Sequence, residues 1–340
     1  MLIFVLSAGV AAQTDEPQGP PEPEISEEAR NGDNVCDEMV PDAVTVLERA
    51  RKTLTTGACR SAAWLDGLFG DRLYYDDYRD TYGSVSAGAL WTDYDGLDPR
   101  VRFRVRMKLP QMDERLSAFI GRVGQDEYVS DSESEFVALP TRQFGGRLEE
   151  ETLLVGLGYS EAERTGNDFD VDVGVRVRLP LDPYARSSYE IIRTFAEQYV
   201  VRARQTVFWQ NSEGFGTTSR LILDRALSER FLVRWGGLAK YTQETEGVEW
   251  YTESTLFQAF SARTALAWQL HVGGQLDNEV PLTDYGARLI LRRRLDPEWL
   301  ILELRAGVHF PRYLLEEERK LSPEAGIALE MQFGRYGLDR

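Results

Sequence analysis

Cationic residues occupy every second position of the stretch VRFRVRMKLP, residues 101–110. They are Arg102, Arg104, Arg106 and Lys108, and the residues between them are apolar. Successive side chains point to opposite faces of a β-strand, so the stretch predicts a strand with one cationic and one apolar face. A cationic row of this kind can attract and bind anions.

Other cations take alternate positions in later segments of the chain: Arg176, Arg178, Arg202, Arg204, Arg288, Arg292 and Arg294. One interpretation is a cationic track that lowers the barrier for anionic solutes. The simpler interpretation is a set of ion pairs that fills the space inside the protein and fixes its shape. Four carboxylates on polar faces are candidates for those pairs: Asp224, Glu253, Glu303 and Glu330.

Catalytic and metal-binding patterns are not evident. A serine hydrolase needs a hydroxyl beside a base, and neither His271 nor His309 lies in a local pattern of that kind. Asp170 and Asp172 are interpreted as charges on a polar strand face, with an acid/base couple or a calcium site as the alternative. The two cysteines and two distant histidines lack the spacing of metal ligands. We therefore predict no enzyme activity, no metal and no cofactor.

The strands that position these residues follow from a period of two that begins at Tyr82. The pattern divides into fourteen predicted strands, with twelve as the alternative: 82–93, 98–110, 115–124, 149–160, 168–180, 185–196, 199–212, 215–226, 229–243, 246–260, 263–276, 282–295, 298–311 and 322–334. Short links such as 196–198 and 261–263 alternate with longer ones such as 243–248 and 310–322. This rhythm is typical of a transmembrane β-barrel.

A soluble β-sandwich is the competing fold, because its strands also alternate. Spanning strands need about 9–11 residues whereas sandwich strands are usually about 5–6 residues long, and the predicted strands are long. Aromatic residues, Trp209, Trp235 and Tyr251 among them, fall near strand ends, as interfacial girdles require. We therefore predict an all-β protein, an antiparallel transmembrane barrel of about fourteen strands preceded by a short helical segment.

The N-terminal fifth differs from the barrel region. Residues 1–12 resemble the apolar part of a secretory signal, with a cut near Gln13, and residues 13–35 are a Pro- and Glu-rich linker. Residues 36–81 predict two short helices joined by a Cys36–Cys59 disulfide, which an oxidising periplasm permits. The formal net charge of −17 argues against nucleic-acid binding.

The segment EAGIALEMQF, residues 324–333, resembles the C-terminal signal strand of Gram-negative outer-membrane β-barrel proteins. Its matching positions are Gly326, Leu329, Met331 and the aromatic Phe333. Many members of that class end at the aromatic residue, whereas this chain continues with a tail, residues 335–340. The resemblance implies a place in the outer membrane and contact with its lipid. It also implies insertion by the barrel-assembly machinery.

These observations predict a porin-like channel or transport protein for small solutes, anionic ones among them. The helices of residues 36–81 would cap or plug its periplasmic mouth. The alternative is a non-conducting structural or assembly protein that binds a periplasmic partner through residues 36–81. A lipid-modifying enzyme comes third. The sequence leaves open whether the lumen conducts.

Overall fold

The computed structural model describes most of the barrel and a short part of the N-terminal region. The described residues are 45, 48–49, 51–56, 81–109, 115–124, 128–130, 138–139, 141, 151–163, 167–195, 198–245 and 247–334. The predicted signal, the linker of residues 13–35, the Cys36–Cys59 disulfide and the tail of residues 335–340 lie outside them. No helix in the described ranges is long and apolar enough to cross a membrane.

The barrel consists of fourteen strands, as predicted, and the twelve-strand alternative is wrong. The strands are β1 (Tyr82–Thr92), β2 (Gly96–Lys108), β3 (Leu116–Gly124), β4 (Glu151–Glu163), β5 (Asn167–Val177), β6 (Asp182–Phe195), β7 (Tyr199–Gln210), β8 (Gly214–Ser228), β9 (Phe231–Thr242), β10 (Glu249–Ser261), β11 (Thr264–Gln275), β12 (Leu282–Arg294), β13 (Leu300–His309) and β14 (Ser322–Gly334).

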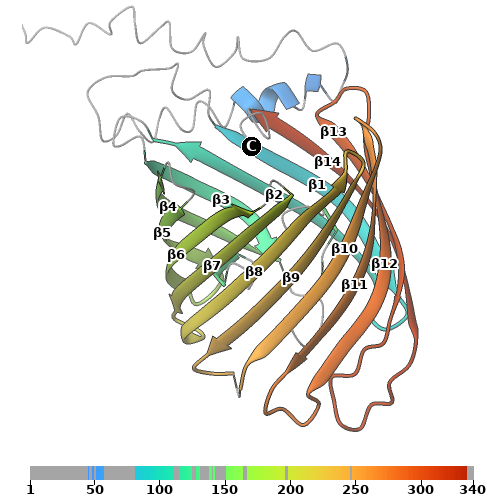
Figure 1. Ribbon diagram of the computed structural model, residues 1–340. Coiled ribbons are helices and arrows are strands. Elements are labelled where there is room, and N and C mark those ends of the chain that lie inside the picture. The colour runs from blue at the N-terminus through green and yellow to red at the C-terminus, as the bar shows by residue number, and fades with distance from the viewer. Residues whose placement is uncertain are drawn as a thin grey trace, which may run out of the picture.

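Each strand pairs antiparallel with its sequence neighbours, and β1 also pairs with β14, which closes the sheet (Figure 1). Tyr82 at the start of β1 lies opposite Gly334 at the end of β14. Closure leaves no edge strand with unpaired backbone groups, which is what a bilayer requires. A soluble sandwich is therefore excluded.

The two faces of the wall differ in the way that the alternation predicts. Outward side chains are large, apolar and exposed, as Leu270, Val173 and Ile327 show. Inward side chains are mostly polar or charged and buried, as Arg176 and Glu303 show. An apolar exterior around a charged interior is the arrangement of a transmembrane barrel and the reverse of a soluble core.

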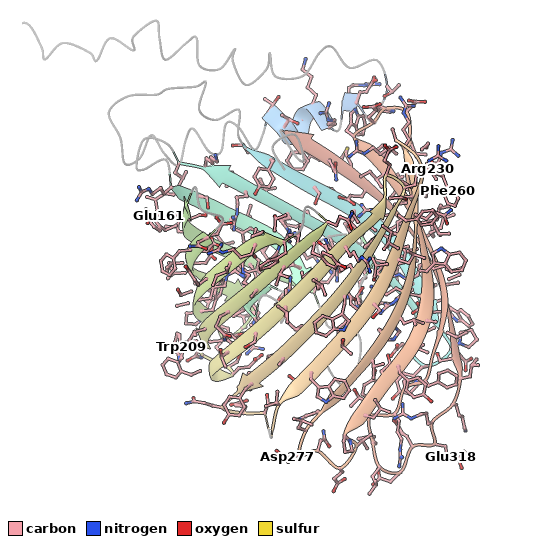
Figure 2. The ribbon with its side chains drawn as sticks, in the orientation of Figure 1. Glu161, Trp209, Arg230, Phe260, Asp277 and Glu318 are labelled. Carbon is pink, nitrogen blue, oxygen red and sulfur yellow. The ribbon has the colours of Figure 1, made fainter. Side chains whose placement is uncertain are left out.

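The two ends of the barrel carry links of different lengths. We call the end where β1 begins and β14 stops the terminal end, and the opposite end the loop end. In Figure 2 the labelled Arg230 and Phe260 lie at the terminal end, and Asp277 and Glu318 lie at the loop end. Links at the terminal end include residues 229–230 and 262–263. Links at the loop end include residues 310–321 and the longest, residues 125–150, between β3 and β4.

The described N-terminal residues form a short helix, residues 51–56, beside the terminal end (Figure 1). The Nε of Arg51 donates a hydrogen bond of 3.3 Å to the carbonyl oxygen of Gln332 on β14. Its guanidinium also lies 5.3 Å from the ring centroid of Trp299, in the link between β12 and β13. The helix is therefore fixed to the rim of the barrel at β12–β14.

Candidate functional site in the barrel lumen

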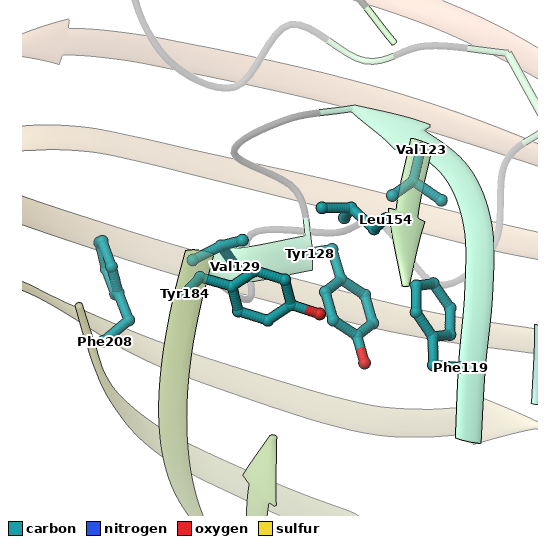
Figure 3. Packing of buried hydrophobic residues seen from close by; sticks show 7 residues of the cluster. All are labelled: Phe119, Val123, Tyr128, Val129, Leu154, Tyr184 and Phe208. Atoms are coloured by element: carbon teal, nitrogen blue, oxygen red, sulfur yellow. The ribbon is translucent and has the colours of Figure 1, made fainter. Parts of the chain in front are cut away.

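Part of the β3–β4 link folds inward and packs against the inner wall. The Tyr128 ring stacks on Phe119 of β3 at a centroid distance of 4.2 Å and meets Tyr184 of β6 edge-on at 6.2 Å (Figure 3). These rings belong to a buried apolar cluster inside the barrel: Phe119, Val123, Tyr128, Val129, Leu154, Tyr184 and Phe208. Burial of this cluster holds the start of the link inside the lumen.

Polar contacts also hold this part of the link, and we call the contacts of Tyr128 the first anchor. The Tyr128 hydroxyl donates to Oδ1 of Asp172 at 3.3 Å, and Nε of Arg186 donates to Oδ2 of the same carboxylate at 2.7 Å. Arg186 also donates to the Tyr128 carbonyl oxygen and lies over the Tyr128 ring. Burial raises the pKa of Tyr128. The hydroxyl therefore stays neutral and keeps its proton for Asp172.

A second anchor lies further along the same link. The backbone amides of Ala138 and Leu139 donate to the two carboxylate oxygens of Glu303 on β13, at 2.7 and 3.3 Å. Arg305 donates to the Leu139 carbonyl oxygen at 3.0 Å. The Leu139 side chain packs in a second apolar cluster with Leu90 of β1 and Ala328 of β14. Glu303 thus acts as a cap for two backbone amides inside the barrel.

The two anchors lie on different sides of the lumen. The first contacts β3, β5 and β6, and the second contacts β13, β14 and β1. The alternation of residues in the sequence did not predict this inward link. Its available signal was length, since structureless links longer than about 12–15 residues are uncommon and are frequently functional.

The cations of the opening stretch lie on the lumen face of β2. Arg102 pairs with Glu151 at 2.7 Å, and Arg106 lies 3.9 Å from Asp172. Arg104 and Lys108 share this face, and Arg104 is in register with Ser84 of β1 and Gly121 of β3. Glu151 is the first residue of β4. The shorter strand β3 lies between β4 and β2, so the Glu151 carboxylate reaches Arg102 across β3.

The predicted cations Arg176 of β5 and Arg202 and Arg204 of β7 also meet carboxylates, whereas Arg178 lies beyond the end of β5 and is exposed at the loop end. Arg176 is fully buried and contacts Asp182, which Arg178 approaches to 3.2 Å. Arg204 bridges Asp170 at 3.0 Å and Glu190 at 3.3 Å. Arg202 lies 3.5 Å from the same Glu190. Asp170 and Asp172 are therefore both engaged in ion pairs, which matches their interpretation as charges on a polar strand face.

The predicted cations of β12 have three different environments. Arg288 donates to the Tyr251 hydroxyl at 3.1 Å, Arg292 pairs with Glu330 and lies 3.8 Å from Glu303, and Arg294 is exposed at the terminal end. Tyr251 is buried inside the barrel. Its assignment to an outer aromatic girdle was wrong, because its odd position in β10 points it to the lumen.

The other two carboxylates proposed as partners are also engaged. Asp224 accepts two hydrogen bonds from Arg234, at 2.6 and 2.8 Å. Glu253 accepts one from Gln269 at 2.8 Å. Together with Glu303 and Glu330, they make the lumen a network of ion pairs and hydrogen bonds and not a row of isolated cations.

Several of these ion pairs are unequally exposed. The side chains of Arg106, Arg202 and Arg292 are 30%, 25% and 24% exposed, whereas their partners Asp172, Glu190 and Glu330 are 5%, 10% and 10% exposed. Two pairs near the loop end show the opposite order. They are Arg100 with Asp98, at 11% and 27%, and Lys240 with Glu213, at 4% and 18%. In the three pairs away from the loop end, the arginine is therefore the more exposed member.

The two histidines contact one carboxylate. His309 Nδ1 lies 3.2 Å from Asp284 Oδ1, and His271 Nε2 lies 3.5 Å from Asp284 Oδ2. No hydroxyl nucleophile contacts either ring among the hydrogen bonds of the described residues. Within those same ranges, no group of three or more His, Cys, Asp or Glu side chains is placed to hold a metal ion.

Solved structures with a similar fold include, by their titles, a porin and an outer-membrane channel. The KdgM porin shares 7% identity over 74% of this chain and 99% of its own, with a TM-score of 0.37. DcaP of Acinetobacter baumannii shares 10% identity over 74% of this chain and 96% of its own, with a TM-score of 0.48. OmpF of Salmonella typhi shares 11% identity over 76% of this chain and 99% of its own, also with a TM-score of 0.48. No family model and no curated protein matches the chain.

The class predicted from the C-terminal strand is confirmed by the closed barrel itself. An even number of antiparallel strands, an apolar exterior, a charged interior and longer links at one end are the features of outer-membrane barrels. The chain is an outer-membrane β-barrel. Its location in the Gram-negative outer membrane follows from the same features.

Proposed function

We propose that the barrel is a channel for small solutes and that it prefers anions. The observation that carries this proposal is the unequal exposure of three ion pairs, in which the arginine side chain is more exposed than its carboxylate partner. A passing anion would meet guanidinium groups first. The carboxylates weaken the positive potential, but they also hold each guanidinium at a fixed place.

The three exposed arginines lie at a similar depth. Arg106, Arg202 and Arg292 are each no more than three residues from the terminal end of their strands. These strands, β2, β7 and β12, are distributed around the barrel. We call this set the arginine ring. Rings of Arg or Lys favour anions in pores because they lower the electrostatic barrier for negative charge.

The anchored link supports a small solute size. Tyr128 and Leu139 both occupy space inside the barrel, and each is held by apolar packing as well as by hydrogen bonds. Side chains and backbone fixed in this way narrow the cross-section available to a solute. Small ions and metabolites fit such a passage better than polymers do.

The described helix, residues 51–56, supports a cap at the terminal mouth. Arg51 is fixed to Gln332 and Trp299 at the rim, which places the described helix beside the opening. The same contact supports the alternative function, a non-conducting protein whose residues 36–81 bind a periplasmic partner. Insertion by the barrel-assembly machinery through the strand that ends at Phe333 is part of either proposal.

Planar-bilayer recording tests the channel and its preference. We expect discrete conductance steps from the purified protein and a reversal potential that indicates anion preference. That preference should fall in the triple variant Arg106→Gln, Arg202→Gln, Arg292→Gln. The matched control is Arg263→Gln, since Arg263 pairs with Asp296 and Glu298 in a link outside the lumen.

The outcomes of this experiment separate the two functions. Each variant must first show the heat-modifiable gel mobility of a folded barrel. Silence of the folded protein, with and without residues 13–81, would reject the channel and favour the structural protein. Conductance with an unchanged reversal potential in the triple variant would retain the channel and reject the role of the arginine ring.

A further inference from the structure

One sector of the outer wall is polar at mid-height. On β6–β10, six outward side chains carry hydroxyl or amide groups, and we call them the polar wall patch: Tyr189, Gln205, Thr217, Ser219, Thr252 and Ser254. Gln205 is central, since residues 199–204 precede it and residues 206–210 follow it in β7. Its neighbours Arg204 and Thr206 face the lumen, so alternation points Gln205 outward.

The register brings the members of the patch together. Tyr189 lies opposite Gln205, and Gln205 lies opposite Ser219. The amide nitrogen of Gln205 donates to Thr217 Oγ1 at 2.6 Å, and the Ser219 hydroxyl donates to the Gln205 amide oxygen at 2.6 Å. Both bonds lie on the exposed outer surface. The amide nitrogen carries two N–H donors, of which this bond uses one.

The wall on the other side of the barrel is different at the same height. Leu289 of β12, Leu304 of β13 and Ile327 of β14 point outward and are exposed. Thr217 and Thr252 donate to the carbonyl oxygens of Thr206 and Gly236, each at 3.0 Å, so part of the patch is satisfied within the chain. Polar groups without a partner are costly in hydrocarbon, and the second N–H of Gln205 is a donor that these bonds do not use. The asymmetry between the two walls singles out β6–β10.

Small residues lie between the polar ones. Ala203 of β7 and Ala239 of β9 are outward positions in this sector, and Ala239 lies opposite Ser219. Small residues allow close approach of a neighbouring backbone in a membrane, and hydrogen bonds from Ser, Thr and Gln then link the two surfaces. The patch thus has the composition of a protein–protein contact.

We propose that the polar wall patch is the contact surface for a second copy of this chain. Only a molecule embedded in the membrane can reach mid-height on the wall. The patch has no charged side chain and offers both donors and acceptors, so one copy of it is complementary to another. Closed assemblies of identical chains are also the commonest kind of oligomer.

Site-specific photo-crosslinking of purified full-length protein in lipid vesicles tests the proposal. A photoreactive amino acid replaces Ser219 in one variant and Ile327, on the apolar wall, in a matched control. We expect a product of twice the chain mass from the Ser219 variant and a several-fold lower yield from the Ile327 variant. Equal yields at both positions, or crosslinks from Ser219 to lipid alone, would overturn the proposal.

A second variant tests the polar contacts themselves. Gln205→Leu with Ser219→Val makes this part of the outward face apolar and leaves the lumen unchanged. We expect loss of self-association in vesicles at a protein-to-lipid ratio where the wild type associates, with heat-modifiable mobility retained. Leu304→Val on the apolar wall is the control and should associate like the wild type. A wild type that stays monomeric at every ratio would also overturn the proposal.

Discussion

The guanidinium of Arg186 lies 4.2 Å from the centroid of the Tyr128 ring, and its Nε donates to Asp172, which also accepts the Tyr128 hydroxyl. One strand residue therefore holds an inward link in two ways, by a cation–π contact and through a shared carboxylate. Because Arg106 approaches the same Asp172, the anchor of the link and the arginine ring are physically connected.

Replacement of Tyr128 should release the first anchor. Tyr128→Ala removes a buried ring, and such truncations typically cost about 3–5 kcal/mol of folding free energy where the surroundings do not collapse. Since the barrel strands do not depend on this ring for pairing, we expect the barrel to stay folded and single-channel conductance to rise.

Tyr128→Phe is the matched control for this prediction. It keeps the stacking on Phe119 and removes only the hydroxyl, so the loss should be about 1 kcal/mol and conductance should change little. Conductance would be measured in planar bilayers at fixed salt. A Tyr128→Ala variant with wild-type conductance would show that the anchored link does not limit the passage.

Glu303 should contribute more to the stability of the fold than a water-exposed carboxylate in the lumen would. Its carboxylate is fully buried, accepts the amides of Ala138 and Leu139, and lies 3.4 Å from Arg305. Glu303→Gln removes the negative charge and leaves Arg305 buried without that charge partner, a change that typically costs about 3–5 kcal/mol. We expect a lower midpoint of the heat-modifiable gel shift.

Asp224→Asn provides a comparison for Glu303→Gln. Asp224 also pairs with an arginine of the lumen, Arg234, but both members of that pair retain some exposure. A water-accessible pair contributes less, so the midpoint should fall by a smaller amount. Equal shifts in the two variants would argue against the capping role of Glu303.

Anion preference should depend on salt, because the arginine ring acts through partly exposed charge. The Debye length is about 30 Å at 0.01 M and about 3 Å at 1 M ionic strength. The ratio of anion to cation permeability should therefore be largest in dilute salt and approach one in concentrated salt. Reversal potentials measured across a series of salt gradients check this. A ratio independent of salt would point to selection by pore size.

The strands and their faces could be predicted from sequence because one rule, the alternation of side chains, decides both. VRFRVRMKLP illustrates this: its cations lie on the lumen face of β2, where Arg102 meets Glu151. Their partners could not be predicted, because a pair such as Arg106 with Asp172 depends on long-range register. The anchors at Tyr128 and Leu139 could not be predicted either, since they lie in a link where alternation has no meaning.

The link of residues 310–321 at the loop end should loosen in acid through Glu317. Its carboxylate accepts the backbone amides of Tyr313, at 2.9 Å, and Leu314, and the hydroxyl of Tyr94 at 2.9 Å. The hydrogen bond from Tyr313 is the largest cause of a pKa below the usual range for this exposed carboxyl. A lowered pKa in the folded state means that the ionised form stabilises the link.

The sign of the pH effect follows from that shift. The stabilisation is fully present above the ordinary carboxyl pKa of about 4.3 and is lost as pH falls through the lower folded-state value. Protease cleavage within the link, with acid-stable pepsin, should therefore accelerate on acidification in the wild type. Glu317→Gln should be cleaved faster near pH 5 and should respond less to acid. Glu318→Gln is the control, because Glu318 is exposed and pairs only with Lys320 at 3.7 Å among the described contacts. Equal cleavage of all three proteins throughout the acid range would contradict the role of Glu317.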